Sequence, residues 1–547
     1  MVFPQAWVLP ECLSGFALRP FFHTGHVWAD AVSNDCLSGD FQRRLATFCP
    51  GAENCAKANL RFELNRDSDE DIGMMKSHIL TIVAMFLIAS LSNAQEGKPN
   101  VLLLMSDDLN TSLSGYGHPQ CKTPRLDELA KRGMRFENMH CQYPVCGASR
   151  ASLMTGLYPY TNGMLGNEGD LRKNLPDVVT MSQLFRKGGY HAGRVSKIYH
   201  MGIPTEILEG TANHDDSLSW DETVNIKALE QNAPGTRTEW SPLDKGSQTF
   251  TGVEASTGDL EHADGMAAEA AIEFLKENKD KPFFLGCGFV RPHVPLVAPS
   301  KYFDLYDRDS MIAPLVPEGD LDDVPGVIRN YKANSRYGVT PELHKGLLEA
   351  YYSSISYMDA QVGRVLDTLD ELGLRENTIV IFSSDHGYLL GHHNKFQKQH
   401  LFEEATRVPF ILSVPWIPET HGKSCKQITE LVDLYPTVAE LAGLKAPDSL
   451  QGQSMASLLR NPAESSWSKR LAFTISRSGG ESIRTNRWRY THWGYGSKGE
   501  ELYDLEKDPG EFNNLAKDLN YHVFLAALRT QLDAKRSEAG YDPKKYK

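Results

Sequence analysis

Residues 100–108, Asn-Val-Leu-Leu-Leu-Met-Ser-Asp-Asp, decide the fold class. The first seven residues carry no charge and form a continuous apolar run, which is typical of a parallel strand that is buried on both faces. The run ends at two adjacent carboxylates, Asp107 and Asp108. The stretch therefore predicts a central strand of an α/β sheet whose carboxyl end is strongly charged.

Further strand-like segments follow along the chain, and segments with helical periodicity separate them. The predicted strands are residues 191–198, 283–289, 378–383 and 408–414. The predicted helices are residues 123–133, 259–279 and 431–442, and a long helix with an apolar face from Ile355 to Leu369 that Gly373 ends. Strands that alternate with helices predict an α/β fold, in which helices sandwich a large and mostly parallel sheet.

The character of the sequence changes after about residue 462. Residues 471–475, 481–485, 488–491 and 501–505 are short strand-like segments with turn residues between them, and residues 521–538 are helix-like. We therefore predict a large domain at residues 95–462 and a C-terminal subdomain at residues 463–547, built from a small antiparallel sheet and a helix. Residues 202–251 and 297–341 are polar or rich in proline, and we expect loops there.

The N-terminal region carries a targeting signal at an internal position. Residues 74–94 contain Lys76, an apolar run too short to span a bilayer, and Ser-Asn-Ala before residue 95. This is the pattern of a secretory signal peptide. We expect residues 1–73 to lie outside the native protein because the start is assigned too early; a genuine extra domain is the alternative. The signal predicts a periplasmic or secreted protein without a stable membrane anchor.

Charge and cysteine content restrict the function further. A net charge of -13 over 547 residues argues against nucleic acid as a partner, so positive contacts with an anionic substrate must be few and local. Five cysteines follow the signal: Cys121, Cys141, Cys146, Cys287 and Cys425. A Cys121–Cys141 disulfide is conceivable, but the sequence does not determine the pairing. The odd number leaves at least one thiol, which is consistent with a separate task for Cys146.

The stretch from Cys146 to Gly156, CGASRASLMTG, predicts a short helix at residues 149–155, which Gly147 and Ala148 lead into and Gly156 ends. Cys146 would lie at the N-terminus of this helix, where free N–H groups and the helix dipole favour an anion. Arg150 would lie about one turn further on, with its guanidinium near the same point. Taken alone, the stretch fits a buried thiol beside a surface arginine better than a reactive site.

Charged residues follow three of the predicted strands. They are Asp107 and Asp108, then His293, then Asp385 with His386. Each taken singly fits a cap or a loop residue, but all of them fall at the carboxyl ends of parallel strands, where ligands bind in open α/β sheets. Carboxylates packed this closely raise one another's pKa values unless a cation compensates, and the oxygen-rich set suits calcium or magnesium.

These motifs resemble those of the type I sulfatases, a family of the alkaline-phosphatase-like superfamily. The family signature is Cys-x-(Pro/Ala)-Ser-Arg followed by Thr-Gly, and Ala148 stands where proline is usual. The resemblance implies that residues 95–462 form the catalytic domain, and that a maturation enzyme converts Cys146 to formylglycine (3-oxoalanine). It also implies that one Ca²⁺ ion is bound by Cys146 in this form together with Asp107, Asp108, Asp385 and His386.

The resemblance assigns four more residues. Lys197 and His200 match the family's Lys-x-x-His, His293 matches its strand-end histidine, and Lys398 has the spacing of its second sulfate-binding lysine, with Lys395 as the near competitor. It implies that Lys197, Lys398 and Arg150 hold the sulfate. His293 would protonate the leaving alcohol with help from Lys398, and His200 would then take a proton so that sulfate is expelled.

Within the family, the motifs are most similar to those of iduronate-2-sulfatases and their bacterial relatives. The matching stretches are residues 385–388, Gly391, residues 406–409 and residues 291–295. The implied function is hydrolysis of sulfate esters on a sulfated sugar or a polysaccharide-derived oligosaccharide. Two alternatives stay open: a phosphate or phosphonate monoester hydrolase on the same fold, and a catalytically inactive protein that binds sulfated glycans.

Overall fold

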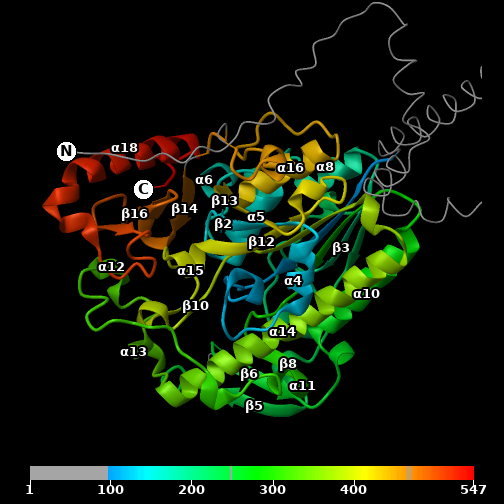
Figure 1. The fold of residues 1–547 in the computed structure, drawn as a ribbon, viewed down its shortest axis with the longest axis horizontal. Coiled ribbons are helices and arrows are strands. Elements are labelled where there is room, and N and C mark those ends of the chain that lie inside the picture. The colour runs from blue at the N-terminus through cyan, green and yellow to red at the C-terminus, as the bar shows by residue number, and fades with distance from the viewer. Residues whose placement is uncertain (1–96, 247–248, 465–466, 470, 547) are drawn as a thin grey trace, which may run out of the picture. The chain divides into compact units, whose positions relative to one another are not determined.

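The computed structural model describes residues 97–246, 249–464, 467–469 and 471–546 (Figure 1). The predicted signal peptide at residues 74–94 and the segment before it lie outside the described residues. All described residues belong to one compact unit, residues 92–547. Within the described residues, no helix combines the length and the apolar character that crossing a bilayer requires.

An eight-stranded sheet forms the centre of the described chain. Its strand order is β13 (Lys423–Glu430), β2 (Met134–His140), β12 (Arg407–Ser413), β9 (Thr378–Ser384), β1 (Asn100–Ser106), β7 (Phe283–Gly288), β3 (His191–Ser196) and β4 (Glu222–Val224). Pairing from β9 to β4 is parallel throughout. β12 runs antiparallel to both of its neighbours, and β2 pairs in parallel with β13. The predicted α/β fold with a large and mostly parallel sheet is confirmed.

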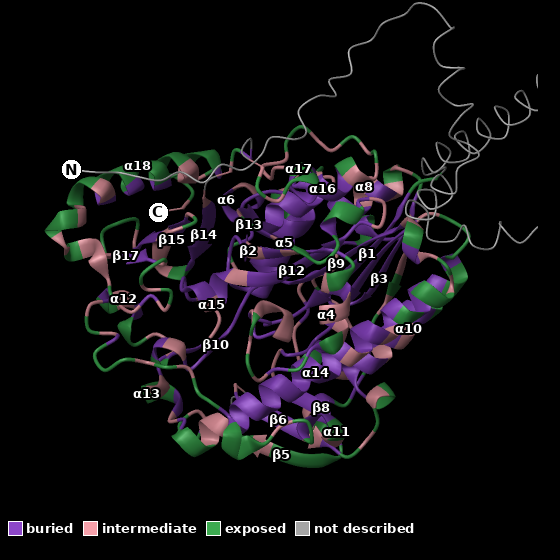
Figure 2. Cartoon of the chain, in the orientation of Figure 1, coloured by how far each residue is buried: buried purple, intermediate pink, exposed green. Residues whose placement is uncertain are grey.

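Helices cover both faces of this sheet. Successive side chains of a strand point to opposite faces, and both faces carry apolar side chains that must be buried. Leu102 and Leu104 of β1 pack into one core, and Val101, Leu103 and Met105 pack into a second one. Figures 1 and 2 show helices on either side of the buried strands. The first core contains side chains of α4 (Pro124–Lys131), α10 (Ala263–Asn278) and α14 (Pro341–Glu371), and the second those of α5 (Cys146–Thr155), α8 (Met181–Lys187), α16 (Leu434–Leu441) and α17 (Ala456–Arg460).

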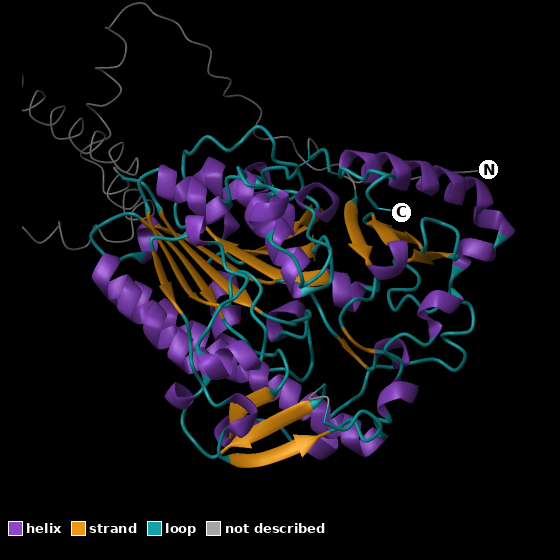
Figure 3. Cartoon of the chain, turned by 180° about the vertical axis from the view of Figure 1, so that it is seen from behind, coloured by secondary structure: helices purple, strands orange, loops and turns teal. Residues whose placement is uncertain are grey.

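The C-terminal part contains the predicted antiparallel sheet and helix. The four strands, in spatial order, are β14 (Ala472–Ser476), β15 (Gly480–Arg484), β16 (Trp488–His492) and β17 (Glu500–Asp504), and α18 (His522–Glu538) follows them. Leu525, Leu528 and Leu532 of α18 share a buried cluster with side chains of this sheet and with Val145, next to Cys146. Figure 3 shows α18 beside the small sheet. The C-terminal part thus supports the segment that leads into α5.

Two of the predicted loop regions contain more structure than expected. Residues 202–251 and 297–341 contribute to a three-stranded sheet of β5 (Gly235–Glu239), β6 (Thr251–Ala255) and β8 (Leu296–Pro299). Besides short 3-10 helices, the other short elements of the described residues are α6 (Pro159–Asn162), α7 (Leu171–Asn174), α9 (Thr205–Glu209), α11 (Ser300–Phe303), α12 (Gly326–Arg329), α13 (Asn334–Tyr337), β10 (Leu389–Leu390), β11 (Phe396–Gln397) and α15 (Glu403–Thr406). Cys121 and Cys141 are buried free thiols, so the disulfide that the sequence left open is not formed.

Candidate active site

The candidate site lies where the central strands end. Adjacent parallel strands place their carboxyl ends along one edge of a sheet. β1 is followed by Asp107 and Asp108, β9 by Asp385 and His386, and β3 by Lys197. The helix α5 begins at Cys146, three residues earlier than the predicted start at Ser149, and Gly156 ends it in a left-handed conformation, as predicted. All of these side chains are buried, although most of them are charged or polar.

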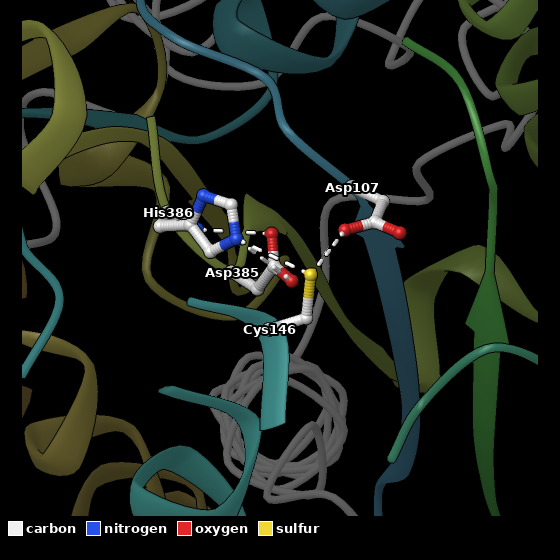
Figure 4. A group of neighbouring side chains, drawn as sticks. All are labelled: Asp107, Cys146, Asp385 and His386. Carbon is white, nitrogen blue, oxygen red and sulfur yellow. Dashed lines mark hydrogen bonds and ion pairs between the residues drawn. The ribbon is translucent and has the colours of Figure 1, made fainter. Parts of the chain in front are cut away.

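Figure 4 shows the centre of this site, where four side chains point toward one another. One ligand atom from each of Asp107, Cys146, Asp385 and His386 lies within 4.8 Å of the others. The Cys146 thiol donates to Asp107 Oδ1 at 3.3 Å, and its Sγ lies 3.4 Å from His386 Nε2. An overlapping group of Asp108, Cys146 and His293 meets the same distance limit. The predicted metal ligands therefore converge around the sulfur atom of Cys146.

Three cations surround these carboxylates. Lys197 Nζ lies 2.5 Å from Asp107 Oδ2, Lys398 Nζ lies 2.7 Å from Asp108 Oδ1, and Arg150 Nε lies 2.8 Å from Asp385 Oδ2. Burial by itself would raise the pKa of Asp107, but the positive charge of Lys197 and other nearby groups outweighs it and holds this pKa well below its usual value. The pKa of Asp108 is lowered in the same way, mainly by Lys398.

The cluster fits a hard divalent cation. Asp108 Oδ2 is buried and accepts no hydrogen bond from any described residue, and Asp107 Oδ2 has only its ion pair with Lys197. Buried carboxylate oxygens normally have hydrogen-bond partners or a metal. Three carboxylates and one imidazole supply the oxygen-rich ligand set that calcium and magnesium prefer.

Arg150 reaches the site, but its N–H groups are directed at the protein itself. Besides its bond to Asp385, the guanidinium donates to the carbonyl oxygens of Lys197 at 2.5 Å, Ile198 at 3.2 Å and Ser106 at 3.1 Å. Its Nη2 also lies 3.7 Å from Asp107 Oδ1. Arg150 thus joins the ends of β1, β3 and β9, while the resemblance alone assigned it to the sulfate.

Lys398, rather than Lys395, enters the cluster. Lys398 Nζ contacts Asp108 and lies 3.4 Å from Cys146 Sγ, and these negative or polarisable neighbours raise its pKa well above the usual value despite the opposing effect of burial. Lys395 Nζ instead donates to the carbonyl oxygens of Ile328, Arg329 and Tyr331. The geometry therefore agrees with the choice of Lys398 over Lys395 that the sequence spacing favoured.

The two predicted histidines lie at the periphery of the cluster. His293 Nε2 lies 3.7 Å from Asp108 Oδ2, and burial together with the charge of Lys398 lowers the pKa of His293 to about 4. Burial and the charge of Lys197 lower the pKa of His200 to about 2. His200 also lines a cavity of about 530 Å³ that reaches Gly147, the second residue of α5. Both imidazoles are therefore neutral at neutral pH.

Sequence reasoning missed several residues that hold this site together. Ser149 Oγ donates to the carbonyl oxygen of Asp385 at 2.5 Å, and Ser384 Oγ donates to that of His386 at 2.9 Å. Lys332 Nζ donates to the carbonyl oxygen of Lys398 at 3.0 Å. The serine of the Cys146 motif gave a usable signal, because it is part of the signature, whereas a lysine in an irregular segment gives none.

Comparison with known proteins identifies the family. The family model described as "Sulfatase" matches residues 99–444, and a model for the C-terminal region of N-sulphoglucosamine sulphohydrolase matches residues 391–538. The chain belongs to the sulfatase family. It is therefore a sulfuric ester hydrolase, and the resemblance that the sequence motifs indicated is confirmed.

Individual relatives and solved structures agree with this assignment. An arylsulfatase of Clostridium perfringens is 32% identical, with 81% of this sulfatase and 96% of the relative covered. Iduronate 2-sulfatase of Mus musculus is 29% identical, and the match covers 82% of this chain and 97% of the relative. A solved 2-O GAG sulfatase has a TM-score of 0.65 and 26% identity, covering 82% of this chain and 94% of its own. Phosphonate monoester hydrolase of Agrobacterium radiobacter shares the fold, with a TM-score of 0.69, 23% identity and coverage of 81% and 96%.

Proposed function

We propose that this sulfatase removes sulfate from a sulfated sugar, with oxidised Cys146 as the nucleophilic residue and one Ca²⁺ ion in the acidic cluster. The position of Cys146 supports this proposal more than any other observation. Its Sγ lies at the start of α5, in contact with Asp107, His386 and Lys398. A nucleophile at this point would meet a sulfate group that the helix N-terminus and two lysines attract.

Cys146 requires chemical conversion for this task. Burial raises the pKa of its thiol, so the side chain is protonated at neutral pH and is a poor nucleophile. Conversion to formylglycine supplies a hydrated aldehyde, which has one hydroxyl to attack sulfur and a second one to release the product. A formylglycine-generating maturation enzyme is therefore the protein partner that we propose, and it must accept Ala148 in place of the usual proline.

The ion would be held by Asp107, Asp108, Asp385 and His386 with the converted Cys146. When bound, Ca²⁺ supplies positive charge that binds the sulfate oxygens and screens their negative charge from the nucleophile. Lys197 adds a buried ammonium beside Asp107, and Lys398 adds a second one beside Asp108. Arg150 takes a positioning role, because its N–H groups hold the three strand ends that carry these residues.

The pKa directions bear on the proposed proton transfers. The raised pKa of Lys398 keeps its ammonium charged at neutral pH, so it can bind sulfate, although a side chain that holds its proton this tightly is a weak acid. We therefore keep His293 as the proposed donor to the leaving alcohol, with help from Lys398; its pKa of about 4 makes its protonated form the stronger acid of the two. His200 is neutral at neutral pH, so it has a free ring nitrogen for the proton whose removal would expel sulfate.

The sugar substrate is proposed from the relatives. The mouse relative is named an iduronate 2-sulfatase, and a solved neighbour is described as a 2-O GAG sulfatase. The predicted secretory signal agrees with a periplasmic or secreted enzyme that meets glycans outside the cytoplasm. The acidic balance of the chain favours oligosaccharides or chain ends over a long polyanionic polymer.

The test is sulfate release from a panel of sulfated mono- and disaccharides, by protein coexpressed with a formylglycine-generating enzyme. Nitrophenyl sulfate and nitrophenyl phosphate are assayed in parallel, and Cys146→Ala is the matched inactive variant. We expect release from at least one sugar sulfate and none from the variant. Preferential hydrolysis of the phosphate ester would favour the phosphate or phosphonate hydrolase. Tight glycan binding without any hydrolysis would favour the inactive glycan-binding protein.

A further inference from the structure

A second group of metal-ligating side chains lies outside the active site. One ligand atom from each of His393, Glu404 and Glu511 lies within 4.8 Å of the other two. His393 precedes β11, Glu404 belongs to α15, and Glu511 follows β17, so the group joins separate elements. The proposed mechanism uses none of these residues, and the cluster around Cys146 contains none of them. The group therefore requires an explanation of its own.

The imidazole of His393 is held in the way that is typical of a metal ligand. Its side chain is 2% exposed, and its Nδ1 lies 3.1 Å from Asp320 Oδ2. Among the described residues, the other ring nitrogen, Nε2, has no hydrogen-bond partner. A histidine that binds a metal through one ring nitrogen usually donates its other N–H to a carboxylate, which fixes the tautomer and the orientation of the ring. His393 and Asp320 form such a pair.

Glu404 supplies a carboxylate oxygen that the protein leaves without a partner. Its Oε2 atom is buried and accepts no hydrogen bond from any described residue. Buried carboxylate oxygens normally have hydrogen-bond partners or a metal. The rest of the Glu404 side chain is partly exposed, which gives an ion a path from the solvent. A cation bound by the group would provide the partner that this oxygen lacks.

Glu511 is positioned by contacts that leave it able to bind an ion. Its Oε1 atom accepts from Arg489 Nε, and its Oε2 atom accepts the backbone N–H of Glu403 at 2.7 Å. Each carboxylate oxygen can accept a further bond, so neither contact blocks a metal. These two contacts fix the Glu511 carboxylate before any ion arrives.

The spacing within the group favours an ion over direct contact. Among the described residues, the ion pair of His393 is with Asp320, and no hydrogen bond or ion pair joins His393 to Glu404 or Glu511. Their ligand atoms nevertheless lie within 4.8 Å of one another. The three side chains thus surround a common point without bonding to each other across it.

We propose that His393, Glu404 and Glu511 bind one divalent transition-metal ion, with Zn²⁺ as the ion used to test the site. One imidazole and two carboxylates, completed by water, form a nitrogen and oxygen ligand set that zinc accepts. With one nitrogen among three protein ligands, this set is less suited to calcium, which prefers oxygen. Asp320 orients the imidazole from outside the ligand set.

The ion would join two parts of the chain near a residue of the active site. His393 and Glu404 lie on either side of Lys398 in the sequence, and Glu511 lies beyond the last strand of the C-terminal sheet. A metal bound by all three would fasten the segment that carries Lys398 to the C-terminal part. The site is separate from the active site, and its existence does not rest on the proposed function.

The test counts zinc bound to the full chain. Cys146→Ala serves as the background because it removes the active-site thiol, which is itself a zinc ligand, and excess Ca²⁺ is present throughout to occupy the acidic cluster around Asp107. The protein is dialysed against buffered Zn²⁺, and bound zinc is measured by inductively coupled plasma mass spectrometry. Glu404→Gln and Glu511→Gln are compared with Glu419→Gln, an exposed glutamate outside the group, as the matched control.

We expect one zinc ion per chain in the background protein and in Glu419→Gln. Glu404→Gln and Glu511→Gln should each lower the zinc affinity about 100-fold or more, because each removes a ligand. Asp320→Asn should weaken binding about 10–100-fold, since it releases the imidazole from its orienting carboxylate. Glu404→Gln should not melt below the background protein when metal is absent, because no described residue bonds to the Oε2 atom that it replaces. Its loss of zinc is then not a loss of the fold.

The melting temperature gives a second measurement. Zinc should raise it in the background protein and in Glu419→Gln, and should leave Glu404→Gln unchanged. A background protein that binds no zinc would overturn the site. Zinc that binds equally well in Glu404→Gln, Glu511→Gln and the control would also overturn it, because the ion would then lie elsewhere. A protein that binds zinc as expected but releases no sulfate from any sugar would refute the proposed function and leave the metal site intact.

Discussion

Arg150 provides a quantitative test of how the site is assembled. Replacing it by methionine keeps a long, unbranched side chain but removes the charge and all donors. The Asp385 carboxylate then loses its 2.8 Å bond, and the carbonyl oxygens of Ser106 and Lys197 lose theirs. Removing one partner of a buried ion pair costs about 3–5 kcal/mol, because the remaining charge is left uncompensated. We expect the free energy of unfolding to fall by that amount.

The corresponding shift in melting temperature follows from the size of the unit. With an unfolding entropy of about 2.1 cal/mol/K per residue, residues 92–547 give roughly 1 kcal/mol/K, so Arg150→Met should melt about 3–5 °C below wild type. Arg150→Lys keeps the charge but cannot reach all the acceptors, so its melting temperature should lie between those of Arg150→Met and wild type. Calorimetry or circular dichroism measures the shift, with Arg460→Met as the control for loss of an exposed arginine.

A melting temperature of Arg150→Met within 1 °C of wild type, combined with complete loss of activity, would refute this reasoning. Arg150 would then act on the sulfate rather than on the strand ends. A variant that loses stability and activity together, and in which Arg150→Lys recovers part of both, agrees with the positioning role.

Three further results are expected from the site and its surroundings. Removing divalent ions with a chelator should lower the melting temperature, and added Ca²⁺ at 100 times its Kd should restore about 2.7 kcal/mol of the free energy of unfolding. Asp108→Asn should weaken this response. A melting temperature that Ca²⁺ does not change would argue against the ion. Gly387→Ala should abolish activity, since a Cβ atom there would lie 2.0 Å from the carbonyl oxygen of Glu404, whereas Gly326→Ala, with open space around it, should be tolerated in the same assay. Burial raises the pKa of Asp359 from 3.8 to about 7, so the folded protein binds the proton of this carboxyl group more tightly than the unfolded chain does. The stability that this protonation contributes is therefore fully present below pH 4 and is lost as the pH rises to about 7. Urea unfolding of wild type and Asp359→Asn should therefore show wild type losing stability relative to the variant between pH 4 and pH 7, and a difference that is independent of pH would contradict the shift.

The central strands could be predicted because their burial is visible in the sequence. β1, β7 and β9 are buried on both faces, so each appears as an uninterrupted apolar run. β2 and β13 lie in the same sheet but contain charged and amide side chains, and no run or alternation identifies them. β5, which is largely exposed, is polar throughout and was expected to be a loop. Strands of this kind are specified by their neighbours rather than by their own composition.

The site could be predicted at its strand ends but not in its supporting contacts. Asp107, Asp385 and Cys146 were identifiable because their positions follow from strand order and from a motif. The turn of Arg150 toward carbonyl oxygens depends on how α5 packs across the strand ends, which spacing does not specify. Lys332 reaches Lys398 from a segment 66 residues away, so no local pattern points to it.

The chemical state of position 146 tests the central claim most directly. The measurement is mass spectrometry of the peptide around Cys146, from protein purified after coexpression with a formylglycine-generating enzyme and shown to release sulfate from a sugar. We expect a peptide in which the sulfur atom is replaced by an aldehyde oxygen, in a fraction that rises with specific activity. An active preparation that carries only unmodified Cys146 would contradict it.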